Sequence, residues 1–86
     1  MARYEIQFRK SVSKDLNPIP KHDIERILAA ITSLANEPRP PQSIKLSGAE
    51  KYRLRCGTYR ILYEIQDSIL LVCVVKIGHR KDVYRV

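Results

Sequence analysis

Two runs of alternating apolar and polar residues, joined at Gly57-Thr58, restrict the fold of this chain more than any other feature of its sequence. Before the glycine, a tyrosine, a leucine and a cysteine alternate with two arginines, and a second run of the same period covers residues 59–65. Period-two alternation around a short glycine-containing connection predicts a β-hairpin over residues 51–65. Side chains alternate between the faces of a sheet, so the apolar members of both runs share one face, which we assign to the core.

A two-residue loop sets the register of this hairpin by counting, and the pairs next to the loop are Cys56–Tyr59, Arg55–Arg60 and Leu54–Ile61. Arg53, Arg55 and Arg60 then share the face opposite the apolar residues. Arg55 opposite Arg60 is unfavourable, since like charges paired across strands destabilise a sheet by about a few tenths of a kcal/mol. Three guanidiniums on one rigid surface suit a polyanion, because each can hold phosphate oxygens in a bidentate manner. The alternative is a solvated face whose charges serve solubility.

The charge balance extends this argument to the whole chain. Its 86 residues predict a single domain, 1–86, and its 44% apolar and 29% charged content is typical of a globular protein. Sixteen Lys and Arg against nine Asp and Glu give a net charge of +7, and residues 45–86 hold nine of the basic groups and four of the acidic ones. Such an excess indicates nucleic acid, an anionic membrane or an acidic protein as partner. Because no apolar run reaches the roughly 18 residues of a membrane span and the N-terminus lacks the apolar core of a signal peptide, we expect a soluble cytoplasmic protein with no membrane partner.

Cysteine spacing and short motifs argue against a bound metal or cofactor. Cys56 and Cys73 stand alone, without CxxC or Cys/His spacing, and strand alternation points them to opposite faces of the sheet. We therefore expect two buried, reduced thiols and no metal site. The chain also has no glycine-rich phosphate loop of Walker or Rossmann type, no HExxH and no GxSxG motif.

The N-terminal half of the chain predicts one strand and two helices. Alternation of apolar and polar residues indicates the strand, and recurrence of apolar residues at i, i+3, i+4 and i+7 indicates a long amphipathic helix. Pro20 suits the first position of that helix, where its missing N–H is no loss. Prolines at 38, 40 and 41 end the helix, and residues 43–50 indicate only a turn at Gly48. The predicted elements are a strand over residues 4–8, a short helix over 9–16, a proline break over 17–20 and a long helix over 21–36.

Residues 69–77 form a nearly continuous apolar run, which is typical of a central strand covered on both faces. A two-residue turn at Asp67-Ser68 pairs this run with the second hairpin strand, and the predicted pairs are Tyr63–Val72, Ile61–Val74 and Arg60–Val75. We therefore predict a small single-domain α+β fold, with a strand, two helices and a three-stranded antiparallel meander, and with the helices packed on one sheet face. The long helix is expected to cover the face that carries Leu54, Ile61 and Val74.

The C-terminal tail adds cations close to the hairpin. Gly78 frees the backbone to turn, and His79, Arg80 and Tyr84 follow it within a few residues. Because this segment leaves the strand next to that of Arg60, we expect Arg80 and Tyr84 to reach the arginine face. A charged tail that is merely solvated is the alternative.

The order of these elements, together with four stretches of sequence, resembles the RelE/ParE superfamily of bacterial toxin–antitoxin toxins over nearly the whole chain. The stretches are Lys45-Leu-Ser-Gly48, Tyr52-Arg-Leu-Arg55, Gly57-Thr-Tyr-Arg-Ile-Leu-Tyr63 and Val75-Lys-Ile-Gly-His-Arg-Lys-Asp-Val-Tyr84. The last stretch is similar to the RelE branch, whose toxins cleave messenger RNA in the ribosomal A site. Relatives of the ParE type, which poison DNA gyrase, usually lack this basic and tyrosine-containing ending.

The resemblance implies a set of catalytic residues and a reaction. Arg53 and Arg55 match two basic residues of the family, Arg60 its next-strand arginine, Arg80 the basic residue after the glycine-containing turn, and Tyr84 the tyrosine near the end. The implied reaction is attack of a ribose 2′-oxygen on its adjacent phosphate, which leaves a cyclic phosphate and a 5′-hydroxyl without a metal or cofactor. Arg60 and Arg80 are candidates to hold the phosphate, Arg53 and Arg55 to position substrate and assist the transition state, and Tyr84 to act on the 2′-oxygen or stack on a base.

Other residues near this set have candidate roles. Imidazole groups commonly serve as acids or bases in enzymes, so His79 is a candidate acid or base, although alternation can equally point it away from the arginines. Candidates for RNA binding are Lys45, Lys51, Lys81 and Arg85.

Two departures from the family pattern bear on the chemistry. Lysines common in some relatives are arginines at positions 53 and 55, and an arginine that always stays charged cannot act as a general base. The segments around the hairpin turn and between Arg80 and Tyr84 are also short, so Tyr84 reaches the site only if the tail folds back tightly. We therefore expect free RNA to be a weak substrate, with the ribosome distorting the message and supplying further groups.

The resemblance implies partners as well. They are a cognate antitoxin with an acidic segment that is disordered when free, the ribosome with its mRNA, and operator DNA only through the toxin–antitoxin complex. Two alternatives stay open at this point: a gyrase inhibitor on the same fold, and a basic module that binds phosphate without cleaving RNA.

Overall fold

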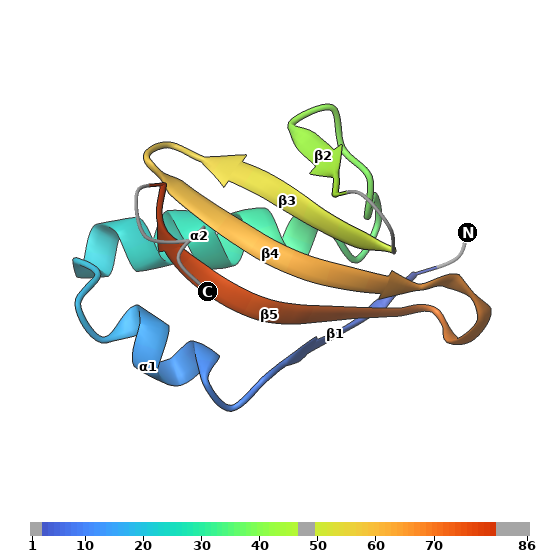
Figure 1. Cartoon of the computed structure of the whole chain (residues 1–86), viewed down its shortest axis with the longest axis horizontal. Coiled ribbons are helices and arrows are strands. Elements are labelled where there is room, and N and C mark those ends of the chain that lie inside the picture. The colour runs from blue at the N-terminus through green and yellow to red at the C-terminus, as the bar shows by residue number, and fades with distance from the viewer. Residues whose placement is uncertain (1–2, 47–49, 81–86) are drawn as a thin grey trace.

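The computed structural model describes residues 3–46 and 50–80. Across these residues the chain forms a five-stranded sheet in the order β1-β5-β4-β3-β2, with the long helix lying behind the sheet (Figure 1). No helix within the two ranges is long and apolar enough to cross a membrane. The elements are β1 (Glu5–Phe8), α1 (Val12–Leu16), α2 (Lys21–Ser33), β2 (Ser43–Lys45), β3 (Lys51–Cys56), β4 (Tyr59–Gln66), the 3₁₀ turn η1 (Asp67–Ile69) and β5 (Leu71–His79).

The hairpin predicted from the sequence is confirmed in every pair next to its loop. Strands β3 and β4 pair Cys56 with Tyr59, and the next two pairs follow the predicted count, Arg55–Arg60 and Leu54–Ile61. Gly57 has a φ of +60° whereas Thr58 keeps a negative φ, which is the order that a type II′ turn requires. Only a residue without a Cβ adopts that first position at no steric cost, so the glycine sets the loop length and thereby the register.

The predicted register between β4 and β5 is wrong, because the connection is longer than two residues. The η1 turn and Leu70, which has a left-handed φ of +52°, separate the strands, so Tyr63 pairs with Val74. The register then shifts between Tyr63 and Leu62, where Val75 is the extra residue of a β-bulge. Beyond the bulge Ile61 pairs with Ile77, so an odd-numbered residue of β5 enters the core.

The sheet has two edge strands that the sequence pattern did not place. Strand β1 runs parallel to β5, in a register that aligns Phe8 with Val74, and the short β2 pairs with β3 at the other edge. Strand β1 begins one residue later than predicted, and β2 lies in the segment for which only a turn was predicted. The prediction that the apolar run is covered on both faces is also wrong, since only alternate residues of β5 on the side of α2 are buried.

Both helices pack on one face of the sheet, as predicted. Ile27 and Ile31 of α2 and Val12 of α1 are buried in one core with the sheet residues Leu54, Ile61, Val74 and their neighbours. Helix α1 is shorter than predicted, because the Arg9 N–H is bonded to the Val74 carbonyl and keeps that residue next to β5. Helix α2 ends at Ser33, before the predicted end at residue 36. Pro20 is its N-cap and not its first residue as predicted, and the Pro20 carbonyl accepts the first bonds of the helix.

Cys56 and Cys73 are free thiols on opposite faces of the sheet, as predicted, but neither is fully buried. Cys56 is the last residue of β3, next to the exposed hairpin loop. Cys73 is aligned with Glu64 on the face that α2 does not cover, so solvent reaches both thiols in part.

Candidate nucleic-acid interface

Basic side chains gather on the sheet face opposite α2, which we call the outer face. Residues that share this face alternate along each strand, and β3 contributes Lys51, Arg53 and Arg55 to it. Strand β4 adds Arg60, which is paired with Arg55. The close like-charge pair inferred from the sequence is therefore present in the folded protein.

Arg60 lies at the centre of this group. Its side chain is half-buried, and its Nη1 donates to the backbone carbonyls of Gly57 and Tyr59 at 3.0 Å each. Burial lowers the pKa of Arg60, and repulsion from Arg55, then Arg53, then Arg80 lowers it further. The guanidinium stays charged at neutral pH because arginine has so high an intrinsic pKa. Three arginines are therefore close enough to repel Arg60, and an anion bound among the four relieves that repulsion.

Arg80 joins the group through a backbone bond. Its N–H donates to the Thr58 carbonyl at 2.9 Å, which ties the end of β5 to the hairpin loop. Gly78, two residues earlier, is the partner of Arg60 across β4 and β5 and has no side chain to fill the space beside it. The four arginines that we call the arginine cluster are Arg53, Arg55, Arg60 and Arg80.

His79 lies on the other face of the sheet. It is aligned with Tyr59, and the two rings meet edge to face with their centroids 6.0 Å apart. Together with Lys14 and Asp15 of α1 they line a cavity of about 330 Å³ on the helix side. The structure therefore does not bring His79 together with the arginine cluster. The bulge at Val75 is the reason, because it exchanges the faces of all later residues of β5.

The two candidate RNA-binding lysines within the described ranges lie in different places. Lys51 is on the outer face, with its Nζ 3.9 Å from Glu64 Oε2. Lys45 is aligned with Tyr52, on the helix side, and its Nζ lies 3.1 Å from Glu50 Oε1. The remaining candidates, Lys81, Tyr84 and Arg85, lie outside the described residues.

Two basic residues of the outer face were not predicted from the sequence. Lys76 is aligned with Leu62, and Arg9 reaches Glu64 with 3.6 Å between Nη2 and Oε2. The predicted register had placed Val75 opposite Arg60, and Lys76 came to the outer face only through the bulge. Arg9 lies there because β1 pairs in parallel with β5. No local pattern in the sequence indicated either event.

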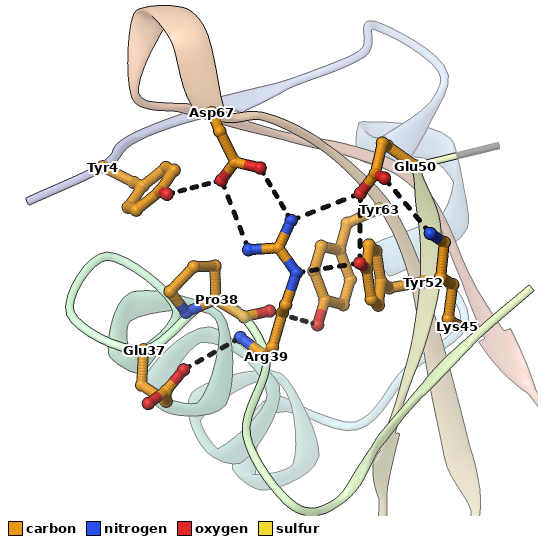
Figure 2. Close-up of polar contacts among 9 residues, drawn as sticks. All are labelled: Tyr4, Glu37, Pro38, Arg39, Lys45, Glu50, Tyr52, Tyr63 and Asp67. Atoms are coloured by element: carbon orange, nitrogen blue, oxygen red, sulfur yellow. Dashed lines mark hydrogen bonds and ion pairs between the residues drawn. The ribbon is translucent and has the colours of Figure 1, made fainter.

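A second polar cluster, also not predicted, surrounds Arg39 (Figure 2). Arg39 holds Asp67 with two bonds, of 2.8 Å from Nη2 and 3.2 Å from Nη1, and its Nη2 is also 3.2 Å from Glu50 Oε2. Its Nε donates to the Tyr52 hydroxyl at 2.8 Å, and its guanidinium carbon lies 5.2 Å from the centre of that ring. Tyr4 donates to Asp67 at 2.6 Å.

Hydrogen bonds within the Arg39 cluster change the pKa values of its two acids, Asp67 and Glu50. The bonds from Arg39 and then Tyr4 lower the pKa of Asp67, and the bonds from Lys45, Tyr52 and Arg39 lower the pKa of Glu50. The cluster joins the loop after α2, strand β3, the η1 turn and the residue before β1. Since its acids and bases neutralise one another, we interpret it as a structural tie and not as a binding site.

The residues of ranges 3–46 and 50–80 include no group of three or more His, Cys, Asp or Glu side chains that could hold a metal ion. Within those ranges, guanidinium and ammonium groups line the outer face, together with the carboxylate of Glu64.

Comparison with known proteins identifies the family. A family model described as "ParE toxin of type II toxin-antitoxin system, parDE" matches residues 6–84. The chain belongs to the RelE/ParE superfamily of type II toxins. It is 34% identical to a Mycobacterium tuberculosis protein named Toxin RelG, over 95% of this chain and 97% of that protein. The RelE/ParE resemblance seen in the sequence is thereby confirmed.

Solved structures of RelE proteins share the fold. The chain is similar to the archaeal RelE–RelB complex from Pyrococcus horikoshii, with a TM-score of 0.82, 31% identity, and coverage of 93% of this chain and 97% of that chain. It is also similar to the toxin–antitoxin complex RelBE2 from Mycobacterium tuberculosis, with a TM-score of 0.70, 32% identity, and coverage of 91% and 99%. The predicted RelE-like α+β architecture is confirmed by these likenesses.

Proposed function

We propose that this RelE/ParE superfamily toxin is a ribosome-dependent endoribonuclease that cleaves mRNA in the A site. The observation that carries the proposal is the arginine cluster, in which a rigid hairpin and the end of β5 hold three further guanidiniums around that of Arg60. The names of the similar proteins support the RelE branch, since they are RelG and RelE.

The proposed reaction uses the cluster as an electrostatic trap for the phosphate. The 2′-oxygen of a ribose loses its proton and bonds to the adjacent phosphorus, and the bond from phosphorus to the 5′-oxygen of the next nucleotide breaks as that oxygen gains a proton. A 2′,3′-cyclic phosphate and a 5′-hydroxyl result. Arg60 and Arg80 hold the non-bridging oxygens, where negative charge increases in the transition state. Arg53 and Arg55 flank them, position the substrate and add to the same field.

The described part of this site offers few groups that can transfer protons. We therefore propose that cleavage depends on the ribosome. Within the described ranges, the outer face carries no histidine, and its acid Glu64 lies next to Arg9 and Lys51. Arginine stays protonated at neutral pH, so it has no site to accept a proton and does not readily release one. We assign action on the 2′-oxygen to Tyr84, which lies outside the described residues, and further proton transfer to groups of the ribosome. Free RNA should consequently be cut slowly.

A cognate antitoxin is part of the proposal. The similar structures are complexes of RelE with RelB, and a chain of net charge +7 suits an acidic segment that folds as it binds. Binding of such a segment over the arginine cluster would exclude mRNA. We further propose that the protein acts in the cytoplasm, and that it reaches operator DNA only through its antitoxin complex.

The test is a reconstituted translation mixture in which mRNA 5′ ends are mapped by primer extension, beside a control without ribosomes. We expect cuts within A-site codons that require ribosomes. Arg60→Ala and Arg80→Ala should each reduce the cleavage rate by about 100-fold or more, while Arg3→Ala, which removes an exposed arginine before β1, should keep it. All three variants should keep the thermal midpoint of the wild type within a few degrees. Full cleavage by folded Arg60→Ala would refute the site.

The family model's description supplies a second candidate, since it names ParE. Inhibition of DNA supercoiling by gyrase, combined with an intact message in the translation mixture, would favour a ParE-type inhibitor. Inhibition of neither process by the folded protein would favour a basic module that binds phosphate without cleavage.

A further inference from the structure

A row of side chains crosses the outer face next to the row that holds the scissile phosphate. In the first row Arg55, Arg60 and Gly78 are aligned across β3, β4 and β5. In the next row the aligned residues are Arg53, Leu62 and Lys76. Two residues along a strand advance about 7 Å, which is comparable to the step between successive phosphates of an extended RNA strand.

A cavity of about 360 Å³ opens beside this second row, and it is lined by Arg9, Ser11, Asp15, Leu62, Val75 and Lys76. Leu62 and Val75 are half-buried, so they present apolar surface without filling the cavity. The cations Lys76 and Arg9 and the Ser11 hydroxyl border it. An apolar lining with a few polar groups, at a volume of a few hundred Å³, is typical of a small-ligand site.

The Lys76 ammonium lies near one carboxylate but can still donate hydrogen bonds to a ligand. Its Nζ lies 3.9 Å from Asp15 Oδ1, at the limit of an ion pair, and its side chain is 29% exposed. The other oxygen of this carboxylate, Asp15 Oδ2, accepts a hydrogen bond of 3.1 Å from the Ile77 N–H. An ammonium has three donors, so Lys76 can bind a phosphate oxygen while it stays close to Asp15.

We infer that this cavity is a subsite for the nucleotide next to the cleaved phosphate, with Lys76 holding that nucleotide's phosphate and Leu62 and Val75 contacting its base or sugar. The inference rests on the proposed function, since it takes RNA as the substrate. It assigns a purpose to the bulge at Val75, which turns both Lys76 and the open Gly78 position to the outer face.

The test measures binding separately from cleavage. A short fluorescent single-stranded RNA, methylated at every 2′-oxygen so that it cannot be cut, is titrated with the protein at several salt concentrations. Lys76→Gln should weaken binding about tenfold and reduce the slope of log K against log salt by about one, because one phosphate contact is lost. Lys76→Arg should keep both values near those of the wild type. Leu62→Ala should weaken binding without a change of slope.

Lys21→Gln is the matched control, because it removes the same charge from an exposed site at the start of α2. Equal slopes for Lys76→Gln and Lys21→Gln would overturn the inference, and so would a wild type that does not bind this RNA. The proposed function fails separately: a wild type that binds the RNA through Lys76 but leaves translated mRNA intact would keep the subsite and refute the nuclease. Conversely, A-site cleavage by the wild type, together with RNA binding by Lys76→Gln that equals the wild type's, would support the nuclease and overturn the subsite.

Discussion

Arg55 and Arg60 lie opposite each other across β3 and β4, so the free protein holds two like charges at the centre of its outer face. Such a pair is unfavourable for folding and favourable for capturing an anion. Arg60 is the more constrained of the two, since it donates to two backbone carbonyls and is half-buried. Arg55 is exposed and can be changed with less disturbance of the hairpin.

Replacing Arg55 should therefore separate stability from activity. Arg55→Gln is expected to raise the free energy of unfolding by about 0.5 kcal/mol, because it removes the like-charge pair, and to lower the rate of mRNA cleavage. Urea denaturation and the translation assay measure the two effects. Arg53→Gln is the control, because Arg53 is aligned with Leu62 and repels Arg60 less than Arg55 does, so its loss should bring a smaller gain. A less stable Arg55→Gln would contradict the argument.

Leu70 is a second residue with a local conflict. It has a left-handed φ of +52°, which costs an ordinary L-residue about 1 kcal/mol or more, and its side chain is 38% exposed. Leu70→Asn should raise the free energy of unfolding by about 0.5 to 1 kcal/mol, since asparagine tolerates this region. Ile69→Asn changes a neighbour that is 61% exposed and has no positive φ, so it should bring no gain. Chemical denaturation of both variants decides the point.

At the scale of elements, helix α1 replaces a strand that stops early. Strand β1 pairs with β5 only as far as Val74, and the Arg9 N–H donates a hydrogen bond to the Val74 carbonyl. Beyond that point the Ile77 N–H has no strand partner on this side, and Asp15 of α1 accepts its bond at 3.1 Å. One carboxylate thus satisfies the strand edge that follows the bulge and lies next to Lys76.

Loss of that acceptor should cost stability. Asp15→Ala is expected to lower the free energy of unfolding by about 1 to 2 kcal/mol, because it leaves the N–H of the buried Ile77 without a partner. Asp15→Asn keeps an acceptor oxygen at the same place and should lose less, although both variants remove the charge. Urea denaturation at one pH compares them. Equal losses in the two variants would mean that the ion pair with Lys76, and not the backbone bond, is what stabilises the contact.

At the scale of the whole molecule, the Arg39 cluster joins segments as far apart in the sequence as Tyr4 and Asp67 (Figure 2). Tyr4 precedes β1, Asp67 begins the connection from β4 to β5, and Glu50 precedes β3. The Tyr63 hydroxyl also donates to the Pro38 carbonyl at 2.7 Å, which anchors the loop that carries Arg39 to the core. Residues that are far apart in the sequence therefore lie close together in this cluster.

This cluster predicts a loss of stability in acid. The native pKa values of Asp67 and Glu50 are both lowered, so their contribution is complete above the unfolded-state values near 4 and is lost as the pH falls through the native values. Asp67→Asn should lower the urea midpoint at pH 7, and its difference from the wild type should shrink by about pH 3. Glu25→Gln, an exposed change on α2, is the control. If the urea midpoints of Asp67→Asn and the wild type differ as much at about pH 3 as at pH 7, the stabilising role of the Arg39 cluster is contradicted.

What the sequence determined by itself was local. The two-residue loop with its glycine and the alternation on either side set the register of β3 and β4, and with it three members of the arginine cluster. The apolar period of residues 21–36 likewise predicted α2 and the sheet face that it covers. These features are legible because each depends on neighbours a few residues apart, where period and turn geometry leave few alternatives.

Tertiary structure decided what depends on contacts far apart in the chain. The parallel docking of β1 on β5 and the Arg39 cluster join segments far apart in the chain, and the edge strand β2 is too short to show a period. The bulge at Val75 mattered most for function, because one extra residue exchanges the faces of a strand: it moved Ile77 into the core, His79 to the helix side and Lys76 to the outer face. A sequence period of two cannot reveal where it is interrupted, since only the packing of both faces selects the position of the extra residue.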